Sequence, residues 1–177
     1  NKNKRDLPWR ISKDPYKIWL SEIMLQQTQV NTVIPYYTSW LKRYKTIQDV
    51  ANADINELLK AWEGLGYYSR CRNFYNASKI VIEKHNGNIP DTYEEFILLP
   101  GVGSYTANAV LSIAYNKNLA AVDVNLKRVF CRMLGFKKYT KHNIKQIEKL
   151  AYRLTQFGQA GDLNQAIMDI GSQICIP

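Results

Sequence analysis

The sequence contains little cysteine and histidine. It has three cysteines and two histidines among 177 residues. So few cysteines, with no recognisable signal peptide, argue against a small secreted scaffold held together by disulfides. Two histidines argue against a histidine-based metal site and against a Ser-His-Asp catalytic triad. Neither class of site is therefore expected.

The sequence also lacks the patterns of β-sheets, repeats and flexible linkers. No segment shows sustained alternation of apolar and polar residues with a period of two, so no sheet is predicted. No internal repeat or low-complexity segment is present. The length suits one domain, or two small lobes that share a junction.

A membrane-spanning helix is not expected. Residues 96–116 carry no charged side chain, and their number raises the possibility of a span. However, Leu-Pro-Gly-Val-Gly at residues 99–103 divides the stretch, and Ser104, Thr106 and Asn108 are too polar for hydrocarbon. A buried pair of helices is the better interpretation, and no membrane partner is predicted.

Basic side chains outnumber acidic ones. Lys plus Arg is 24 and Asp plus Glu is 15, which gives a net charge of +9. Such an excess favours a polyanionic partner. Residues 1–45 carry +6, residues 46–104 carry −3 and residues 105–177 carry +6. Either this is chance scatter over the surface, or the two ends of the chain meet and form one positive face.

Local signals predict an all-α protein of about ten short helices. Asp14-Pro15 begins one helix, because aspartate caps a helix and proline suits its first position. Asp54-x-x-Glu57 and Thr92-x-x-Glu95 are typical of capping boxes. Gly87 is a candidate C-cap and Gly135 a stop. Helices are expected over residues 15–27, 54–64, 69–86, 104–114, 123–134, 143–157 and 162–174.

Glu22 is a candidate general acid. It is the only charged residue between Lys17 and Lys42, and its helical neighbours Ile18, Trp19, Leu25 and Gln26 cannot pair with it. A carboxyl group in apolar surroundings should have a raised pKa and can then hold a proton near neutral pH. The alternative is a partly exposed glutamate on a thin polar stripe with Ser21.

Asp123 is the only charged residue between Lys117 and Lys127, after an apolar run. It is a good helix N-cap, and a carboxylate held by backbone N–H groups stays ionised. One protonated and one ionised carboxyl group would suit cleavage of a glycosidic bond, because one can protonate the leaving group while the other opposes a cationic sugar.

Two glycine-containing loops are candidate ligand-binding elements. Leu99–Gly103 separates two helices, and the next helix begins at Ser104 with free N–H groups that can bind an anion. A plain helix connection is equally open. In Gly64–Arg70, tyrosines beside glycines could wedge between base pairs, together with Gln26-Gln27 elsewhere. The alternative is two core tyrosines with satisfied hydroxyl groups.

Six stretches together resemble the adenine DNA glycosylases of the MutY type, within the endonuclease III or helix-hairpin-helix superfamily. They follow in order, from about residue 6 to the last residue. The hairpin alone would indicate only the wider superfamily, and Gln26-Gln27-Thr28 and Gly66–Arg70 narrow the resemblance. The stretches are LPWR at 7–10, SEIMLQQTQV at 21–30, WEGLGYYSR at 62–70, LPGVGSYTA at 99–107, VDVN at 122–125 and NQAIMDIG at 164–171.

The resemblance implies hydrolysis of the N-glycosidic bond of adenine mispaired with 8-oxoguanine or guanine, in base excision repair. Glu22 matches the family's acid, Asp123 the carboxylate that stabilises the sugar cation, and Asn125 a family asparagine beside it. Tyr105 stands where bifunctional relatives carry a lysine nucleophile, and a phenol cannot form a Schiff base. Gln27 and Tyr67 match the wedge, Gly101, Val102 and Gly103 the phosphate-binding hairpin, and Arg10 the adenine pocket.

The family fold implies two lobes with an active cleft between them. Residues 22–125 are expected to form a six-helix lobe, with the helix-hairpin-helix at about 92–115. Residues 1–21 and 126–177 are expected to form the second lobe. The implied partner is double-stranded DNA with an adenine mispair, bound by a monomer. The expected location is intracellular, cytoplasmic and nucleoid-associated in a bacterium.

Three features depart from the family. Val124 replaces a usual glycine after the aspartate, and this β-branched residue is expected to be tolerated. The family's 4Fe-4S cluster uses cysteines in a C-x6-C-x2-C-x5-C pattern, of which only Cys175 is matched; Cys71 and Cys131 are expected in the core. The C-terminal 8-oxoguanine-reading domain is also unmatched, so a fragment of a longer protein is expected.

Two other functions remain open. One is a related glycosylase that removes mismatched thymine, or a bifunctional base-lesion lyase. The other is a non-catalytic helix-hairpin-helix DNA-binding module. Tyr105 argues against lyase chemistry, and the presence of both Glu22 and Asp123 argues against binding alone.

Overall fold

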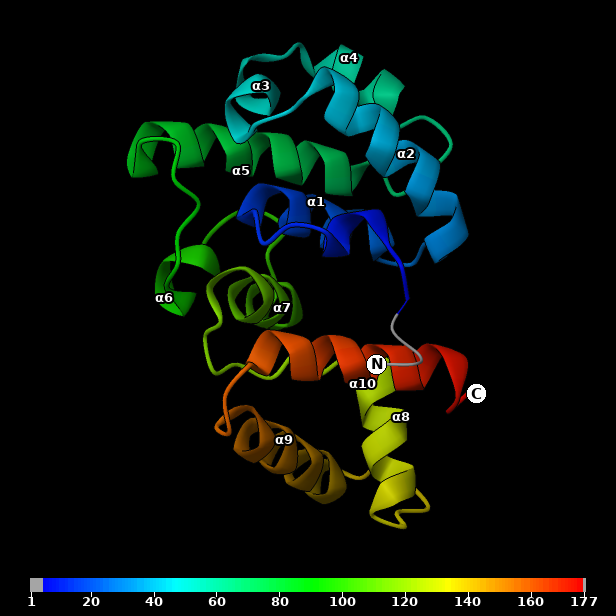
Figure 1. The fold of residues 1–177 in the computed structure, drawn as a ribbon. Coiled ribbons are helices and arrows are strands. Elements are labelled where there is room, and N and C mark those ends of the chain that lie inside the picture. Colours follow the sequence, from blue (N-terminus) through cyan, green and yellow to red (C-terminus); the bar gives the residue numbers. More distant parts are fainter. Residues whose placement is uncertain (1–4, 177) are drawn as a thin grey trace. The chain divides into compact units, whose positions relative to one another are not determined.

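The computed structural model describes residues 5–176, and within these residues every regular element is a helix (Figure 1). The all-α prediction is therefore confirmed. The elements are one 3-10 helix, η1 (Pro8–Arg10), and the α-helices α1 (Pro15–Leu25), α2 (Val30–Arg43), α3 (Ile47–Asn52), α4 (Ile55–Ala61), α5 (Ser69–His85), α6 (Tyr93–Phe96), α7 (Ser104–Tyr115), α8 (Val124–Met133), α9 (Lys141–Thr155) and α10 (Ala160–Gln173).

Several helix ends follow from local chemistry, as predicted. The carboxylate of Asp14 accepts from the backbone N–H of Tyr16 at 2.9 Å and caps α1. Asp54 caps α4 in the same way, through the backbone N–H of Asn56, and so does not form the expected capping box with Glu57. Helix α5 ends at Asn86 and Gly87, which have φ values of 52° and 78°. These left-handed residues stop the helix.

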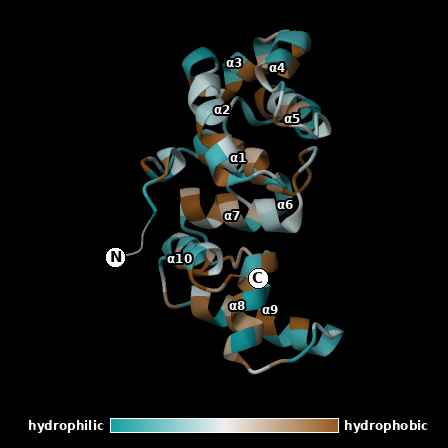
Figure 2. Ribbon diagram, turned by 90° about the vertical axis from the view of Figure 1, so that its right-hand side faces the viewer, coloured by the Kyte–Doolittle hydropathy of each residue, from teal (hydrophilic) through white to brown (hydrophobic). Residues whose placement is uncertain are grey.

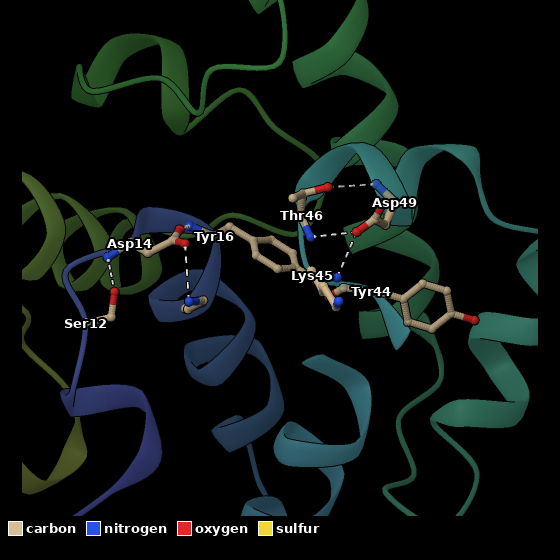
Figure 3. A network of polar contacts seen from close by, with 8 residues as sticks. Ser12, Asp14, Tyr16, Tyr44, Lys45, Thr46 and Asp49 are labelled. Carbon is tan, nitrogen blue, oxygen red and sulfur yellow. Dashed lines mark hydrogen bonds and ion pairs between the residues drawn. The ribbon is translucent and has the colours of Figure 1, made fainter. Parts of the chain in front are cut away.

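The expected capping box at Thr92 and Glu95 is wrong. The Thr92 hydroxyl donates to the Glu95 carboxylate at 2.9 Å, and Thr92 makes no side-chain cap to the backbone of α6. The reciprocal box occurs instead at α3. There Thr46 accepts from the backbone N–H of Asp49, and the Asp49 carboxylate accepts from the backbone N–H groups of Lys45 and Thr46 (Figure 3).

The same polar network ties the beginning of α1 to the end of α2. The buried Tyr16 hydroxyl donates to the backbone carbonyl of Tyr44 at 2.6 Å and accepts from Trp40 Nε1 at 3.0 Å. Burial raises the pKa of Tyr16 far above its usual value. The phenol therefore remains a neutral donor, and α1 is fixed against α2.

The described chain divides into two compact units. One comprises residues 7–107, and the other comprises residues 5 and 6 with 108–176. The lobes expected from the family resemblance had boundaries after residues 21 and 125, whereas these units divide after residues 6 and 107. Helix α1 packs on α2 and α5, which places residues 7–21 in the first unit.

The core of the 7–107 unit is aromatic. Trp19 on α1 packs edge-on against Phe74 of α5 and Phe96 of α6, with both pairs of ring centroids 5.0 Å apart. Trp40 and Trp62 form a further edge-to-face pair with centroids 5.6 Å apart. In Figure 2, hydrophobic (brown) segments of α1 stand beside hydrophilic (teal) ones. Within residues 5–176, no helix is both long and apolar enough to cross a membrane.

The second unit packs α8, α9 and α10 around a smaller apolar cluster. Buried members of this cluster include Leu126 and Phe130 of α8, Ile147 of α9 and Ile167 of α10. Near its first turn, α10 also approaches the backbone of α7 closely at Gly161. A Cβ added there would lie 2.5 Å from the carbonyl oxygen of Ser112 and 2.8 Å from Ile113 Cα.

We expect Gly161→Ala to destabilise the protein by about 1–3 kcal/mol, because two helix backbones must separate to admit the methyl group. Thermal unfolding followed by circular dichroism measures the change. Gly103→Ala is the matched control, since a Cβ at Gly103 meets nothing within 4 Å. Equal melting temperatures for the two variants would contradict this close approach.

Candidate active site

Glu22 is buried inside an apolar helix. Its exposed fraction is 7%, and Ser21 beside it is 1% exposed and donates its hydroxyl to the Ile18 carbonyl. The interpretation of a partly exposed polar stripe is therefore wrong. Residues Ile18 to Met24 of α1 are all buried, so this carboxyl group is surrounded by packed protein.

Glu22 accepts a hydrogen bond from a side chain of α7. The Tyr105 hydroxyl donates to Glu22 Oε2 at 3.0 Å, although the two residues lie 83 positions apart. The next residue of α7 makes a similar contact, because Thr106 Oγ1 accepts from Gln26 Nε2 at 3.3 Å. The first turn of α7 thus contacts both the carboxyl group of α1 and the loop that follows it.

Asp123 caps α8, as the sequence predicted. Its Oδ1 accepts from the backbone N–H of Leu126 at 2.7 Å, and its Oδ2 accepts from Asn125 Nδ2 at 2.9 Å. The side chain is half-buried. Both carboxylate oxygens of Asp123 therefore accept hydrogen bonds, which fix the orientation of the side chain. Asp123 and Asn125 belong to the 108–176 unit, whereas Glu22 and Tyr105 belong to the 7–107 unit.

Arg128 and Asn164 make hydrogen bonds to the residues that precede and follow Asp123 in the chain. Arg128 donates to Asn125 Oδ1 at 2.9 Å and to the carbonyls of Gly171 and Cys175. Buried Asn164 binds the segment before Asp123: it accepts from the N–H of Ala121 and donates to the carbonyl of Leu119. Asp123 is thus positioned from both sides along the chain.

The candidate wedge residues stand on exposed loops. Tyr67 is 59% exposed and Tyr68 is 40% exposed, so the interpretation of two core tyrosines is wrong. Gln27 is exposed as well. Gln27 and Tyr67 have positive φ values of 57° and 49°, an unusual conformation for residues with a Cβ. Both side chains belong to the 7–107 unit.

The helix-hairpin-helix turn lies between α6 and α7. Gly101 has a φ of +77°, and a Cβ there would lie 2.8 Å from Asn73 Cβ. Val102 is buried, while Gly101 and Gly103 are exposed at the beginning of α7. The first N–H groups of a helix lack intrahelical partners, so this end can bind an anion. Arg10 ends η1 and is half-buried beside Trp9.

Val124 is accommodated without strain. It occupies the first position of α8, is 73% exposed, and is absent from the residues with a positive φ. The backbone at this position therefore does not require glycine.

The cysteines of this chain do not fit a 4Fe-4S cluster. Such a cluster takes four thiolate ligands, and the sequence has three cysteines. Cys71 and Cys131 are buried in different units, and burial raises the pKa of Cys71 to about 12. Half-buried Cys175 accepts from Arg132 Nη1 at 3.1 Å. In residues 5–176, no three His, Cys, Asp or Glu side chains are grouped to hold a metal.

Sequence reasoning missed the roles of two arginines. Arg70 lies in a motif that was recognised for its tyrosines, and Arg128 lies one helical turn after Asn125. The available signal for Arg128 was its i,i+3 spacing from Asn125, which places both on one helix face. The contacts of Arg70 with residues 23–28 are long-range and have no local signal.

The glycine turn between α6 and α7, within an all-helical fold that buries a carboxyl group on α1, is typical of a helix-hairpin-helix protein. Residues 20–154 match the profile of the HhH-GPD superfamily base excision DNA repair proteins, and the chain belongs to this family. It is 44% identical to an adenine DNA glycosylase of Buchnera aphidicola subsp. Baizongia pistaciae over 98% of its length, and 43% identical to the human adenine DNA glycosylase over all of it. The chain spans 49% and 34% of the lengths of these two relatives.

Solved structures agree on the fold. A thermostable thymine-DNA glycosylase is 33% identical, with a TM-score of 0.91; the match covers 100% of this chain and 82% of that chain. A non-covalent endonuclease III–DNA complex is 24% identical, with a TM-score of 0.80 and coverage of 95% and 78%. The latter similarity supports the shared fold alone.

Proposed function

We propose that this chain is the catalytic core of an adenine DNA glycosylase, which hydrolyses the N-glycosidic bond of adenine mispaired with 8-oxoguanine or guanine. The observation that carries the proposal is buried Glu22, with the hydroxyl of Tyr105 as its hydrogen-bond donor. The curated relatives named adenine DNA glycosylase, from bacteria, animals and a plant, support this choice of base.

In the proposed reaction, protonated Glu22 donates its proton to N7 of an extruded adenine. The bond between C1′ and N9 then breaks with both electrons leaving on the purine, and positive charge develops on the sugar. The Asp123 carboxylate, which accepts hydrogen bonds from the Leu126 N–H and from Asn125 Nδ2, opposes that charge. Water adds at C1′ while Glu22, now a carboxylate, accepts its proton. The products are free adenine and an abasic site.

Tyr105 fits hydrolysis without strand cleavage. A bifunctional enzyme needs an amine that forms a Schiff base with C1′, and a phenol cannot supply one. Gln27, Tyr67 and the hairpin at residues 101–103 are proposed to hold the duplex, with Arg10 at the adenine. Because the proposed substrate is DNA, an intracellular location, nucleoid-associated in a bacterium, is part of the proposal.

Mismatched thymine is the second candidate substrate. The thymine-DNA glycosylase with a TM-score of 0.91 favours it, because the two chains share 33% identity and most of their lengths.

Single-turnover incubation with three labelled duplexes tests the choice. They carry adenine opposite 8-oxoguanine, adenine opposite guanine, and thymine opposite guanine, each analysed with and without alkali. We expect alkali-dependent nicking at adenine and none at thymine. Nicking at thymine would assign the second candidate, nicking without alkali would indicate a lyase, and binding without nicking of any duplex would indicate a DNA-binding module. A full-length adenine glycosylase serves as the positive control.

A further inference from the structure

Arg70 joins two loops that are distant in the sequence. It lies in the first turn of α5, is 8% exposed, and directs its guanidinium group away from solvent. One amino group, Nη1, donates to the carbonyl oxygens of Ile23 at 3.1 Å and Met24 at 3.0 Å, and also to that of Gln26. These carbonyls end α1 and begin the loop that carries Gln27.

The other amino group of Arg70 reaches the second loop. Nη2 donates to the carbonyl oxygens of Leu65 and Gly66, both at 3.1 Å, and to Thr28 Oγ1 at 3.2 Å. The backbone N–H of Arg70 donates to the Tyr67 carbonyl at 2.9 Å. A single side chain thus spans the segment around Gln27 and the segment before Tyr67.

The contacts of Arg70 surround both residues with unusual backbone conformations. Gln26 and Thr28 flank Gln27, whose φ is 57°, and Gly66 precedes Tyr67, whose φ is 49°. A left-handed conformation is unfavourable for residues with a Cβ, and surrounding contacts must maintain it. Arg70 supplies such contacts on both loops.

Arg70 also supports the ring of Tyr67. Its guanidinium carbon lies 5.3 Å from the centroid of that ring and 5.5 Å from the centroid of Trp62. Among the ion pairs of residues 5–176, none involves Arg70, and carbonyl oxygens and aromatic faces surround its charge instead. Burial lowers the pKa of Arg70. A cation held away from water at this place indicates a specific task, since arginine is rarely buried without a carboxylate.

We infer that Arg70 is a positioning residue, which holds Gln27 and Tyr67 in the geometry in which both enter the duplex beside the target base. The inference rests on the proposed function. Arg70 acts through these two residues and does not contact the reacting atoms. Lysine cannot replace it, because a single ammonium point charge cannot match the planar fork that bonds both loops.

The test compares Arg70→Lys with Arg72→Lys, the same exchange at an exposed position of α5. Amide hydrogen exchange of the DNA-free protein is measured first. We expect exchange of residues 26–28 and 65–68 to accelerate in Arg70→Lys, while exchange elsewhere and in Arg72→Lys is unchanged. Uniform acceleration along the chain would overturn the inference, because Arg70 would then be a general stabilising residue.

A second measurement follows the duplex. With 2-aminopurine beside the mispair, the fluorescence rise that reports unstacking should be reduced in Arg70→Lys. Excision should fall by about 10- to 100-fold, as expected for misplaced positioning groups, while the dissociation constant for the duplex changes less. Unchanged unstacking in Arg70→Lys would overturn the inference.

Two further outcomes distinguish a failure of this inference from a failure of the proposed function. If the unaltered chain excises no adenine, the proposed reaction fails, whereas hydrogen exchange and unstacking still report on Arg70. If Arg70→Lys does not fold, Thr28→Val keeps Arg70 and removes the hydroxyl that accepts from Nη2 and donates to the Gln26 carbonyl at 3.4 Å; it should accelerate exchange at residues 26–28 alone. Wild-type exchange there in Thr28→Val would then overturn the inference.

Discussion

Glu22→Gln is expected to lower adenine excision by about two to four orders of magnitude, the usual contribution of a positioned proton donor. Glutamine has the same shape and still offers an oxygen to the Tyr105 hydroxyl, so the buried contact at 3.0 Å can persist. What is lost is the ability to donate a proton to the purine. Single-turnover rates and duplex binding, measured on the same preparation, separate the two effects.

Glu63→Gln is the matched control for this prediction, because Glu63 is exposed and lies in the same unit. It should retain the excision rate of the unaltered chain. Excision by Glu22→Gln at nearly the same rate would remove Glu22 from the mechanism. Loss of duplex binding together with excision would instead indicate that Glu22 has a structural role.

Asp123→Asn should lower excision by about 10²–10³-fold, the range for removing one stabilising group from a transition state. Asparagine is as good an N-cap as aspartate, so the bond to the Leu126 N–H can persist. The second oxygen is replaced by an amide that cannot accept from Asn125 Nδ2, which should reduce stability by about 1 kcal/mol. Excision should therefore fall far more than the melting temperature.

Asp54→Asn applies the same exchange to another N-cap, at the beginning of α4. It should change neither excision nor melting temperature appreciably. Near-normal excision by Asp123→Asn would mean that Asp123 only caps α8 and has no role in the reaction. Comparison of the two variants thus separates the charge of Asp123 from its hydrogen bond to the helix.

Local chemistry predicted the helices well where one residue type has one favoured role. Asp14 before Pro15, Asp123 before α8 and Asn86-Gly87 after α5 were all identified from neighbouring residues. Thr92 was misread because its hydroxyl binds the Glu95 carboxylate directly instead of the backbone. Such a choice between two partners of similar energy depends on side-chain rotamers, which the sequence pattern does not specify.

In the candidate site, too, features set by neighbouring residues were predicted and long-range contacts were not. The isolation of Glu22 in the sequence predicted a carboxyl group on an apolar helix, and the structure buries it. Its contact with Tyr105, and the bonds from Arg70 to Ile23 and Met24, join residues 46 to 83 positions apart. These pairings arise only when the helices pack, so they could not be derived from spacing along the chain.

Gly161 is not the only place where α10 admits nothing larger than hydrogen. At Gly171, a methyl group would lie 2.7 Å from Asn125 Cβ, beside the proposed carboxylate. Substitutions at these two glycines should therefore raise the mutation frequency of a strain, as substitutions of Glu22 and Asp123 should. A genetic screen that scores only this frequency would not distinguish the two kinds of substitution. Immunoblots of the same strains would tell them apart, because a distorted helix depletes the polypeptide whereas a missing acid leaves its abundance intact.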